Sequence, residues 1–172
     1  MPITELATLQ LRPGKTWADI IPHIQTASRE QSSCSGYPLY FFDDIHAPGL
    51  FYLLSGWESV HAHEQWIASP TNQDLVKALT PNCDILGLRH LIISPGESWK
   101  DAAMMLYVRT EEGKQPSLPE VNVVWKGFGG DAEGKNKGIV YLIVHNNEES
   151  EIPECANVTD QEVRWLRRHD IN

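Results

Sequence analysis

The segment from Phe51 to Leu79 constrains the fold more than any other part of the chain. It opens with an apolar run that ends at Leu54, passes through Gly56 and Trp57, and then changes to helical spacing. A short continuous apolar run is typical of a buried strand, and Ser59 stands where a helix N-cap is expected. The segment therefore predicts a core strand that leads directly into a helix.

Composition excludes several classes of protein. The chain has 172 residues, of which 41% are hydrophobic and 22% are charged, as in an ordinary globular protein. Its 14 basic and 23 acidic residues give a net charge of −9, which repels phosphate backbones, so we expect no nucleic-acid partner. No run reaches the roughly 18 apolar residues of a membrane-spanning helix, and the N-terminus lacks a signal-peptide pattern. We therefore expect a cytoplasmic protein with no membrane partner.

The cysteines and the glycine-rich segment indicate neither a metal nor a cofactor. Cys34, Cys83 and Cys155 are far apart and odd in number, which fits neither a disulfide framework nor a zinc-binding pair. The segment 129–135 spells G-x-x-x-x-G-K, but Asn136 replaces the required Ser or Thr and a strand follows. We expect three free thiols, a hairpin loop at 129–135, no metal and no cofactor.

The first half of the chain follows the β-α-β-β-α-β order of a ferredoxin-like unit. Alternating residues predict strands, helical spacing predicts helices, and Thr16 is a plausible cap of the first helix. The second helix is broken at Ser69-Pro70, because proline suits a first turn better than an interior. The expected elements are strands at 3–11, 39–45, 50–57 and 85–93, and helices from Trp17 to Ala27 and from Ser59 onward. Residues 1–96 are the predicted ferredoxin-like half.

Residues 97–172 are predicted to form a shorter, degenerate second α+β half. Pro116 and Pro119 break the position where the first half has its first helix. A faint repeat, FYLLSGWES from Phe51 and VYLIVHNNEES from Val140, suggests a duplicated and eroded copy. The expected elements are strands at 103–109, 121–128 and 139–145, and a closing helix from Asp160 to His169 capped by Thr159.

The pattern W-E-S-x-x-A-H-E-x-W-I-x-S from Trp57 to Ser69 resembles the dimeric α/β-barrel superfamily, and within it the fungal antibiotic-biosynthesis-monooxygenase-like (ABM-like) proteins. The resemblance covers about residues 1–95. It implies that two ferredoxin-like sheets, from two chains or two halves, pack face to face into a barrel that holds a ligand. Members include cofactor-free oxygenases, polyketide cyclases and haem-degrading enzymes. Because the second half is incomplete, we expect a homodimer.

The chain departs from this family at one position. Bacterial members of the group usually carry a histidine nine residues after the pivot tryptophan, whereas this chain has Trp66 there and His63 three residues earlier. The oxygenase mechanism therefore does not transfer directly, and a catalytic role must be argued from the residues that are present.

His90 is the main catalytic candidate, since histidine titrates near neutral pH. On its predicted strand it shares one face with Leu86, Leu88 and Ile92, while Arg89 lies on the other face. Whichever face lines the barrel contributes one polar group within an apolar wall, as in many small-molecule pockets. The alternative is a hydrogen-bonded core histidine.

Other candidates come from the helix start and from the aromatic strands. His63 and Tyr52 are catalytic candidates, the latter as a donor to a substrate oxygen, although His63 could instead be a helix-start residue that packs on the sheet. The predicted substrate-binding residues are Tyr40, Phe42, Trp57, Trp66 and Arg89. The alternative for the aromatic residues is an ordinary sheet core.

These features predict a cofactor-independent enzyme of secondary metabolism. It would use acid/base catalysis for cyclisation, rearrangement or elimination on a polyketide-like or other carbonyl substrate, a hydrophobic or aromatic small molecule held in the barrel pocket. One alternative is a cofactor-free monooxygenase of an aromatic or phenolic polyketide. Another is a non-catalytic ligand-binding or dimerisation protein.

Overall fold

In the computed structural model, which describes residues 1–147, 152 and 161–171, eight strands form one sheet in the order β4-β1-β3-β2-β8-β5-β7-β6. Neighbouring strands are antiparallel throughout. The strands are β1 (Ile3–Leu11), β2 (Tyr40–Asp44), β3 (Leu50–Trp57), β4 (Cys83–Leu91), β5 (Met104–Thr110), β6 (Val123–Gly129), β7 (Ile139–His145) and β8 (Gln161–Arg168). The helices are α1 (Trp17–Ser35), α2 (Val60–Ile67), α3 (Pro70–Leu79) and the short 3₁₀ helix η1 (Glu97–Trp99).

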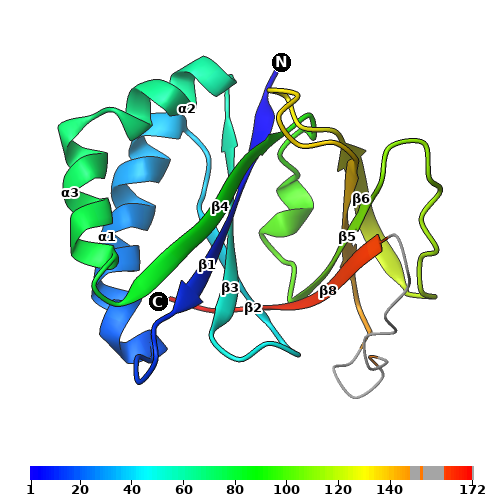
Figure 1. The fold of residues 1–172 in the computed structure, drawn as a ribbon, viewed down its shortest axis with the longest axis horizontal. Coiled ribbons are helices and arrows are strands. Elements are labelled where there is room, and N and C mark those ends of the chain that lie inside the picture. Colours follow the sequence, from blue (N-terminus) through cyan, green and yellow to red (C-terminus); the bar gives the residue numbers. More distant parts are fainter. Residues whose placement is uncertain (148–151, 153–160, 172) are drawn as a thin grey trace.

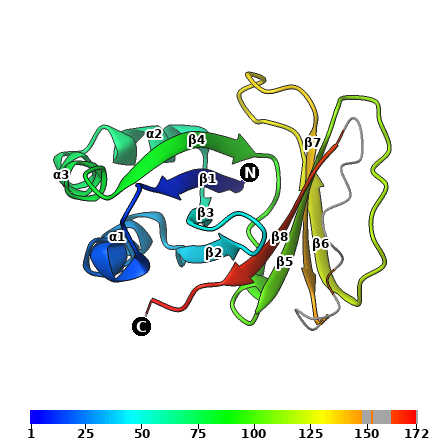
Figure 2. The ribbon, with the colours of Figure 1, turned by 60° about the horizontal axis from the view of Figure 1, so that its bottom comes forward.

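The second half of the sheet repeats the strand order of the first. The order β4-β1-β3-β2 is followed by β8-β5-β7-β6, in which each strand number is raised by four. Figure 2 shows the two halves facing each other, joined where β2 pairs with β8. The expected α+β, ferredoxin-like barrel fold is confirmed, and one chain supplies both halves of its sheet. The outer strands β4 and β6 approach each other at a single isolated bridge between Leu91 and Asp131.

The three α-helices cover the outer face of the first half, as Figure 1 shows. Thr16 and Asp19 form a capping box at the start of α1. The Ser59 side chain caps α2 by accepting from Ala62 N, and Ser69 caps α3, in which Pro70 is the first residue. The predicted helix starts and the predicted break at Ser69-Pro70 are confirmed.

The sheet has two apolar faces because side chains alternate along each strand. The inner face carries a core with members from both halves of the chain, including Leu6, Tyr52, Leu91, Tyr107 and Leu166. The outer face of the first half packs on α1 through Ala7, Leu9, Phe41, Phe51, Ile20 and Ile24. The outer face of the second half is covered by Leu118, Val121 and Ile152, which lie outside helices and strands.

The predicted closing helix at 160–169 is wrong. Gln161–Arg168 is strand β8, which pairs with β2 on one side and β5 on the other. Val163 and Trp165 pack on the outer face and Leu166 packs on the inner face. Two ladders of backbone hydrogen bonds decide the conformation here, and local spacing does not reveal them. Thr159, the predicted cap, lies outside the described residues.

Other predictions agree with the fold. β6 and β7 form the expected hairpin; the loop between them is 130–138, and Gly129 is the last residue of β6. Cys34 and Cys83 are free, and Cys155 lies outside the described residues. Within the described part of the chain, no helix has the length and apolar character needed to cross a membrane.

Candidate functional site

The sheet divides the predicted site residues between its two faces. Tyr40, Phe42 and Tyr52 belong to the inner core. Arg89 is paired with Leu6, an inner-core residue, so its side chain also starts on the inner face. The remaining predicted residues, His63, Trp57, Trp66 and His90, lie on the outer, helix-covered side. The residues predicted as one pocket therefore belong to two separate environments.

Four titratable side chains on the outer side form a continuous chain of contacts. His63 Nδ1 lies 2.7 Å from His90 Nε2, and His90 Nδ1 lies 2.8 Å from Glu133 Oε2. On the other side, His63 Nε2 lies 3.5 Å from Glu5 Oε1. Both histidines are 2% exposed, while the Glu133 side chain is 18% exposed. We call Glu5, His63, His90 and Glu133 the relay; it leads from the protein interior to solvent.

Glu5 is the buried end of the relay. Its Oε2 accepts hydrogen bonds from Trp57 Nε1 at 2.8 Å and from Gln31 Nε2 at 2.7 Å. Burial raises the pKa of Glu5 to about 7, although both hydrogen bonds act to lower it. A carboxyl group with a pKa near 7 can act as an acid or a base at neutral pH.

The other relay members have different protonation states. Burial lowers the pKa of His63 to about 3, helped by the charge of His90, so His63 is neutral at physiological pH. Its ring stacks on Trp57, with ring centroids 4.5 Å apart. Hydrogen bonds from Lys135 and His90 lower the pKa of Glu133, which is therefore an ionised acceptor.

These states assign the protons of the relay. Ionised Glu133 can only accept, so His90 carries its proton on Nδ1 and, when neutral, accepts at Nε2. His63 must then donate from Nδ1 to His90, which leaves His63 Nε2 as an acceptor facing Glu5 Oε1. The Oε2 atom of Glu5 already accepts twice, so its proton belongs on Oε1. Every relay proton thus points toward Glu133.

Each relay residue is positioned by a different element. Glu5 on β1 and His90 on β4 are direct cross-strand partners. His63 lies in the first turn of α2, one turn after the cap Ser59. Glu133 comes from the β6–β7 loop, which passes beside the end of β4 in Figure 1.

The β6–β7 loop is held in place by hydrogen bonds. The Asp131 carboxylate accepts from Glu133 N at 3.0 Å and from Asn136 N at 2.7 Å. Ala132 N donates to His90 O at 2.7 Å, and Ile92 N donates to Gly130 O at 2.9 Å. The loop of the second half is therefore fastened to β4 of the first half next to His90.

A groove of about 390 Å³ lies over Trp57 and Trp66, near the relay. Its size falls in the range of small-molecule sites. The lining residues are Cys34, Ser35, Trp57, Glu58, Ala62, Gln65, Trp66, Ser69 and Thr71. The Trp57 indole connects this groove to the relay, because it binds Glu5 and stacks on His63.

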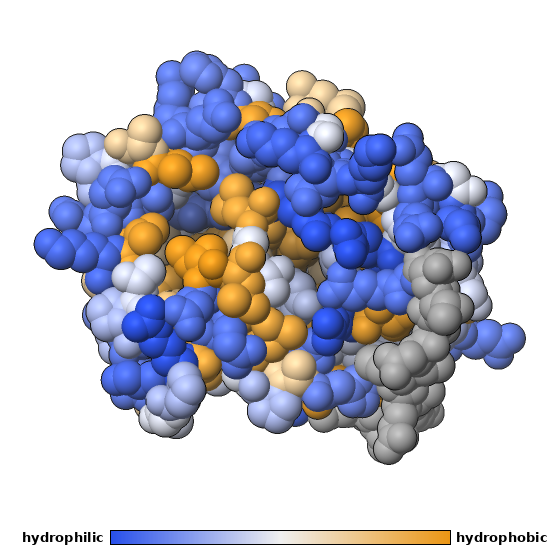
Figure 3. Space-filling view, in the orientation of Figure 1, coloured by the Kyte–Doolittle hydropathy of each residue, from blue (hydrophilic) through white to orange (hydrophobic). Residues whose placement is uncertain are grey.

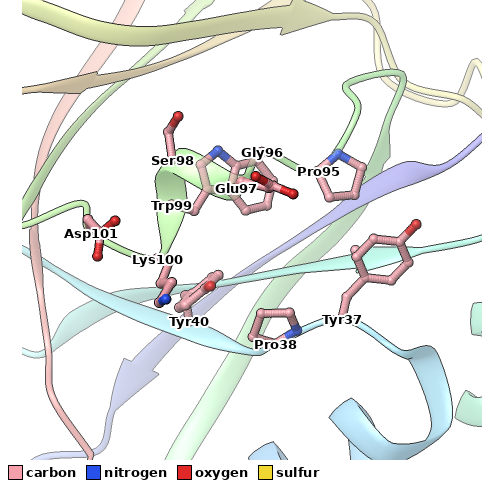
Figure 4. Close-up of a pocket in the computed structure, with 11 residues that line it drawn as sticks. Tyr37, Pro38, Tyr40, Pro95, Gly96, Glu97, Ser98, Trp99, Lys100 and Asp101 are labelled. Atoms are coloured by element: carbon pink, nitrogen blue, oxygen red, sulfur yellow. The ribbon is translucent and has the colours of Figure 1, made fainter.

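A larger pocket, of about 750 Å³, opens at one end of the barrel. In Figure 4, Tyr37, Pro38 and Tyr40 lie on one side of it, and Pro95 and Trp99 lie on the other. Its charged residues Glu97, Lys100 and Asp101 are exposed, and no relay residue lines it. It is an aromatic pocket in which Tyr40 is the buried titratable residue among those that line it.

Among the described residues, no group of three or more His, Cys, Asp or Glu side chains has an arrangement that could hold a metal ion. The two histidines of the relay are bonded to each other and to carboxyl groups. The arrangement is suited to moving protons.

Comparison with known proteins supports the fold. No protein-family model matches the chain. No curated protein matches it in sequence.

Among solved structures, a candidate monooxygenase of Lactobacillus acidophilus matches with a TM-score of 0.61 at 13% identity, over 97% of this chain and 93% of that chain. A candidate monooxygenase of Fusobacterium nucleatum matches with a TM-score of 0.64 at 9% identity, over 97% and 92%. A chlorite dismutase variant of Candidatus Nitrospira defluvii matches with a TM-score of 0.62 at 9% identity, over 99% and 92%. The two-half architecture is therefore shared by proteins of nearly the same extent.

Sequence reasoning missed three residues of this site, namely Glu5, Gln31 and Glu133. Glu5 could have been noticed, because it interrupts the otherwise apolar face formed by Ile3, Ala7 and Leu9. A charged residue among buried neighbours is unusual unless it has a partner. Nothing in the sequence near Glu133 indicates its contact with His90, which lies 43 residues earlier in the chain.

Proposed function

We propose that this protein is a cofactor-independent enzyme that moves protons on a small molecule by means of the relay. The single observation that carries the proposal is the contact of 2.7 Å between two buried histidines that lie between two carboxyl groups. Burying three titratable groups, Glu5, His63 and His90, is costly unless they are satisfied, and such clusters are concentrated at functional sites.

The relay prepares Glu5 as a base. The proton on Glu5 Oε1 moves to His63 Nε2, the His63 Nδ1 proton moves to His90 Nε2, and the His90 Nδ1 proton moves to Glu133. Both histidines end neutral with their protons on the opposite nitrogens, Glu5 becomes a carboxylate, and Glu133 becomes neutral. Glu133 then releases the proton to solvent. Glu5 can now take a proton from a substrate, and the reverse sequence returns one.

The groove over Trp57 and Trp66 is the substrate position that we propose. Its aromatic floor suits a flat ring, and its polar rim suits carbonyl and hydroxyl groups. The Trp57 indole lies between this groove and Glu5, so the proposal requires the ring to turn away when substrate enters, which frees Glu5 Oε2. The substrate class is an aromatic or polyketide-like carbonyl compound with an acidic C–H or phenolic proton, and the outcome is cyclisation, rearrangement or elimination.

Oxygenation is a second candidate. It is supported by the full-length likeness to two candidate monooxygenases. Deprotonation would again be the first step, after which the substrate anion would react with oxygen without a cofactor. Oxygen consumption in the presence of substrate, and labelled oxygen in the product, would separate this candidate from the first.

Proton exchange provides the test. The protein is incubated in D₂O with a panel of aromatic ketones and phenolic polyketides, and deuterium incorporation is followed by mass spectrometry. We expect Glu5→Gln and His63→Asn to slow exchange by about 100-fold or more, the usual contribution of a general acid or base. His61→Asn is the matched control, since His61 is exposed on the same helix. Equal exchange by the wild type and Glu5→Gln would contradict the proposal, and no exchange with any compound would favour a non-catalytic role.

A further inference from the structure

The inner face of the barrel carries a second group of polar residues, separated from the relay by the sheet. Arg164 on β8 is paired with Tyr107 on β5, and Glu162 is paired with Arg109 two residues further along. Tyr52 of the first half faces Tyr107, with ring centroids 5.8 Å apart. Both halves of the chain therefore contribute to this interior.

Four arginines reach this interior, and one of them, Arg168, lies over the Tyr40 ring and donates to Trp99 O. Arg109 lies 3.4 Å from Glu162, and Arg164 lies 3.2 Å from Glu162 and 3.5 Å from Asp44. Two arginines are thus matched by two carboxylates. Arg89 reaches the same interior from β4, and within the described part of the chain it forms no hydrogen bond or ion pair. In a chain of net charge −9, an inward-facing arginine without a carboxylate partner is unexpected.

The interior is open beside Arg89. Gly87, two residues earlier, is paired with Thr8, which in turn is paired with Tyr52, so all three face inward. A β-carbon added at Gly87 would have no atom within 4 Å. Among the residues that the structure describes, the bridge between β4 and the end of β6 is at Leu91, so the space in front of Gly87 lies open between these two strands. Figure 3 shows this face of the molecule hollowed at its centre.

The two tyrosines offer hydrogen-bond donors to this space. Neither hydroxyl group makes a hydrogen bond to any residue that the structure describes. Burial raises the pKa of Tyr52, and it raises the pKa of Tyr107 to about 12 even though Arg89 and two other arginines act to lower it. Both hydroxyls therefore keep their protons at neutral pH.

We propose that the barrel interior binds a small aromatic carboxylate. Its carboxylate pairs with the Arg89 guanidinium and accepts from the hydroxyls of Tyr52 and Tyr107, and its ring packs on Leu6 and Leu91, the inner-core neighbours of Arg89. A planar guanidinium suits a carboxylate because it can donate two parallel hydrogen bonds. This site is distinct from the relay and does not depend on it.

Calorimetric titration with 2-naphthoate tests the proposal, with the neutral amide 2-naphthamide as the comparison ligand. We expect saturable binding of one 2-naphthoate per chain and at least about tenfold weaker binding of 2-naphthamide, since a hydrogen-bonded charge is lost. Arg89→Gln should weaken 2-naphthoate binding by about tenfold or more. Arg29→Gln is the matched control, because Arg29 is an exposed arginine on α1, and it should bind as the wild type does.

A second measurement does not depend on the folding of a variant. In the wild type, the ¹⁵N–¹H signal of Arg89 Nε should shift during the titration, and that of Arg29 should not. Equal affinity for acid and amide, no binding of 2-naphthoate, or an unmoved Arg89 signal would each overturn the proposal. His63→Asn should leave the affinity unchanged, so failure of the relay proposal and failure of this one give different results.

Discussion

Glu5 and His63 show how burial acts on single residues. Burial raises the pKa of Glu5 to about 7 and lowers that of His63 to about 3. The directions differ because a low-dielectric interior penalises whichever form is charged, the carboxylate in one case and the imidazolium in the other. Between about pH 3 and pH 7 both groups are therefore mostly neutral, and a proton can pass between them without creating a lasting buried charge.

Glu5 should make stability fall as pH rises. Between its ordinary pKa of 4.5 and about 7, the folded state keeps the proton that the unfolded state has lost, so the free energy of unfolding decreases with pH. His63 acts in the opposite direction between about 3 and 6.5, because there the unfolded state binds the extra proton. The difference between the wild type and Glu5→Gln isolates the first effect.

We expect Glu5→Gln to gain stability relative to the wild type as pH rises from 4.5 to 7, by on the order of 2 to 3 kcal/mol. Urea unfolding at a series of pH values measures this difference. A difference that does not change with pH would mean that the pKa of Glu5 is not raised in the folded protein.

The proton positions in the relay are also testable. We expect ¹⁵N NMR at neutral pH to show His63 protonated on Nδ1 alone, because Nδ1 must donate to His90. Glu133→Ala should release the His90 ring and change its tautomer populations, since the acceptor for Nδ1 is removed. A spectrum with the His63 proton on Nε2 would reverse the assigned direction of the relay.

At the scale of elements, the meeting of β4 and β6 depends on a close backbone approach. A β-carbon at Gly129 would lie 2.1 Å from Ile92 O, closer than any real contact, whereas one at Gly87 would meet nothing within 4 Å. Gly129→Ala must therefore push the two strands apart where the β6–β7 loop is fastened. Gly87→Ala should be tolerated.

We expect Gly129→Ala to lower the free energy of unfolding by about 1–3 kcal/mol, the usual cost of overpacking. Gly87→Ala should stay within about 0.5 kcal/mol of the wild type, as for an unhindered surface change. Denaturant unfolding of the two variants provides the comparison. Equal effects would show that the approach of β4 and β6 does not contribute to stability.

The repeat in the sequence has a structural counterpart with a difference in register. β3 and β7, which contain its two copies, occupy equivalent places in the two halves of the sheet. Aligned letter by letter, Tyr52 corresponds to Tyr141, yet Tyr52 is in the inner core and Tyr141 packs on the outer face. A slip of one residue exchanges the faces of a strand. The repeat therefore predicts the strand and not the direction of its side chains.

At the scale of the whole molecule, each half of the sheet covers the apolar inner face of the other half. The inner face of residues 1–96 carries large apolar side chains, among them Phe42, Tyr52 and Leu54, that the second half covers. The division at residue 96 remains a prediction. If the division is right, a fragment of residues 1–96 should self-associate, because without the second half of the sheet only a second copy could cover its apolar inner face.

Light scattering of the purified 1–96 fragment measures this directly. We expect a dimer or larger species. In the complete chain β2 pairs with β8, so in the fragment β2 becomes an exposed edge strand that can pair with a second copy. A folded monomeric fragment would show that the first half does not need cover. For the complete chain, a molar mass near twice 19.4 kDa would support the predicted homodimer, which the barrel itself does not require, since one chain supplies both halves of the sheet.

The sequence by itself determined the elements of the first half and the hairpin of the second, because apolar periodicity, caps and prolines act over a few residues. Only the tertiary structure decided that 161–168 is a strand, since its partners β2 and β5 come from distant parts of the chain. It also decided that His90 faces the helices while Arg89 and Tyr52 face the barrel. Glu5, His63, His90 and Glu133 meet through strand pairing and loop placement over tens of residues, and no local pattern records such contacts.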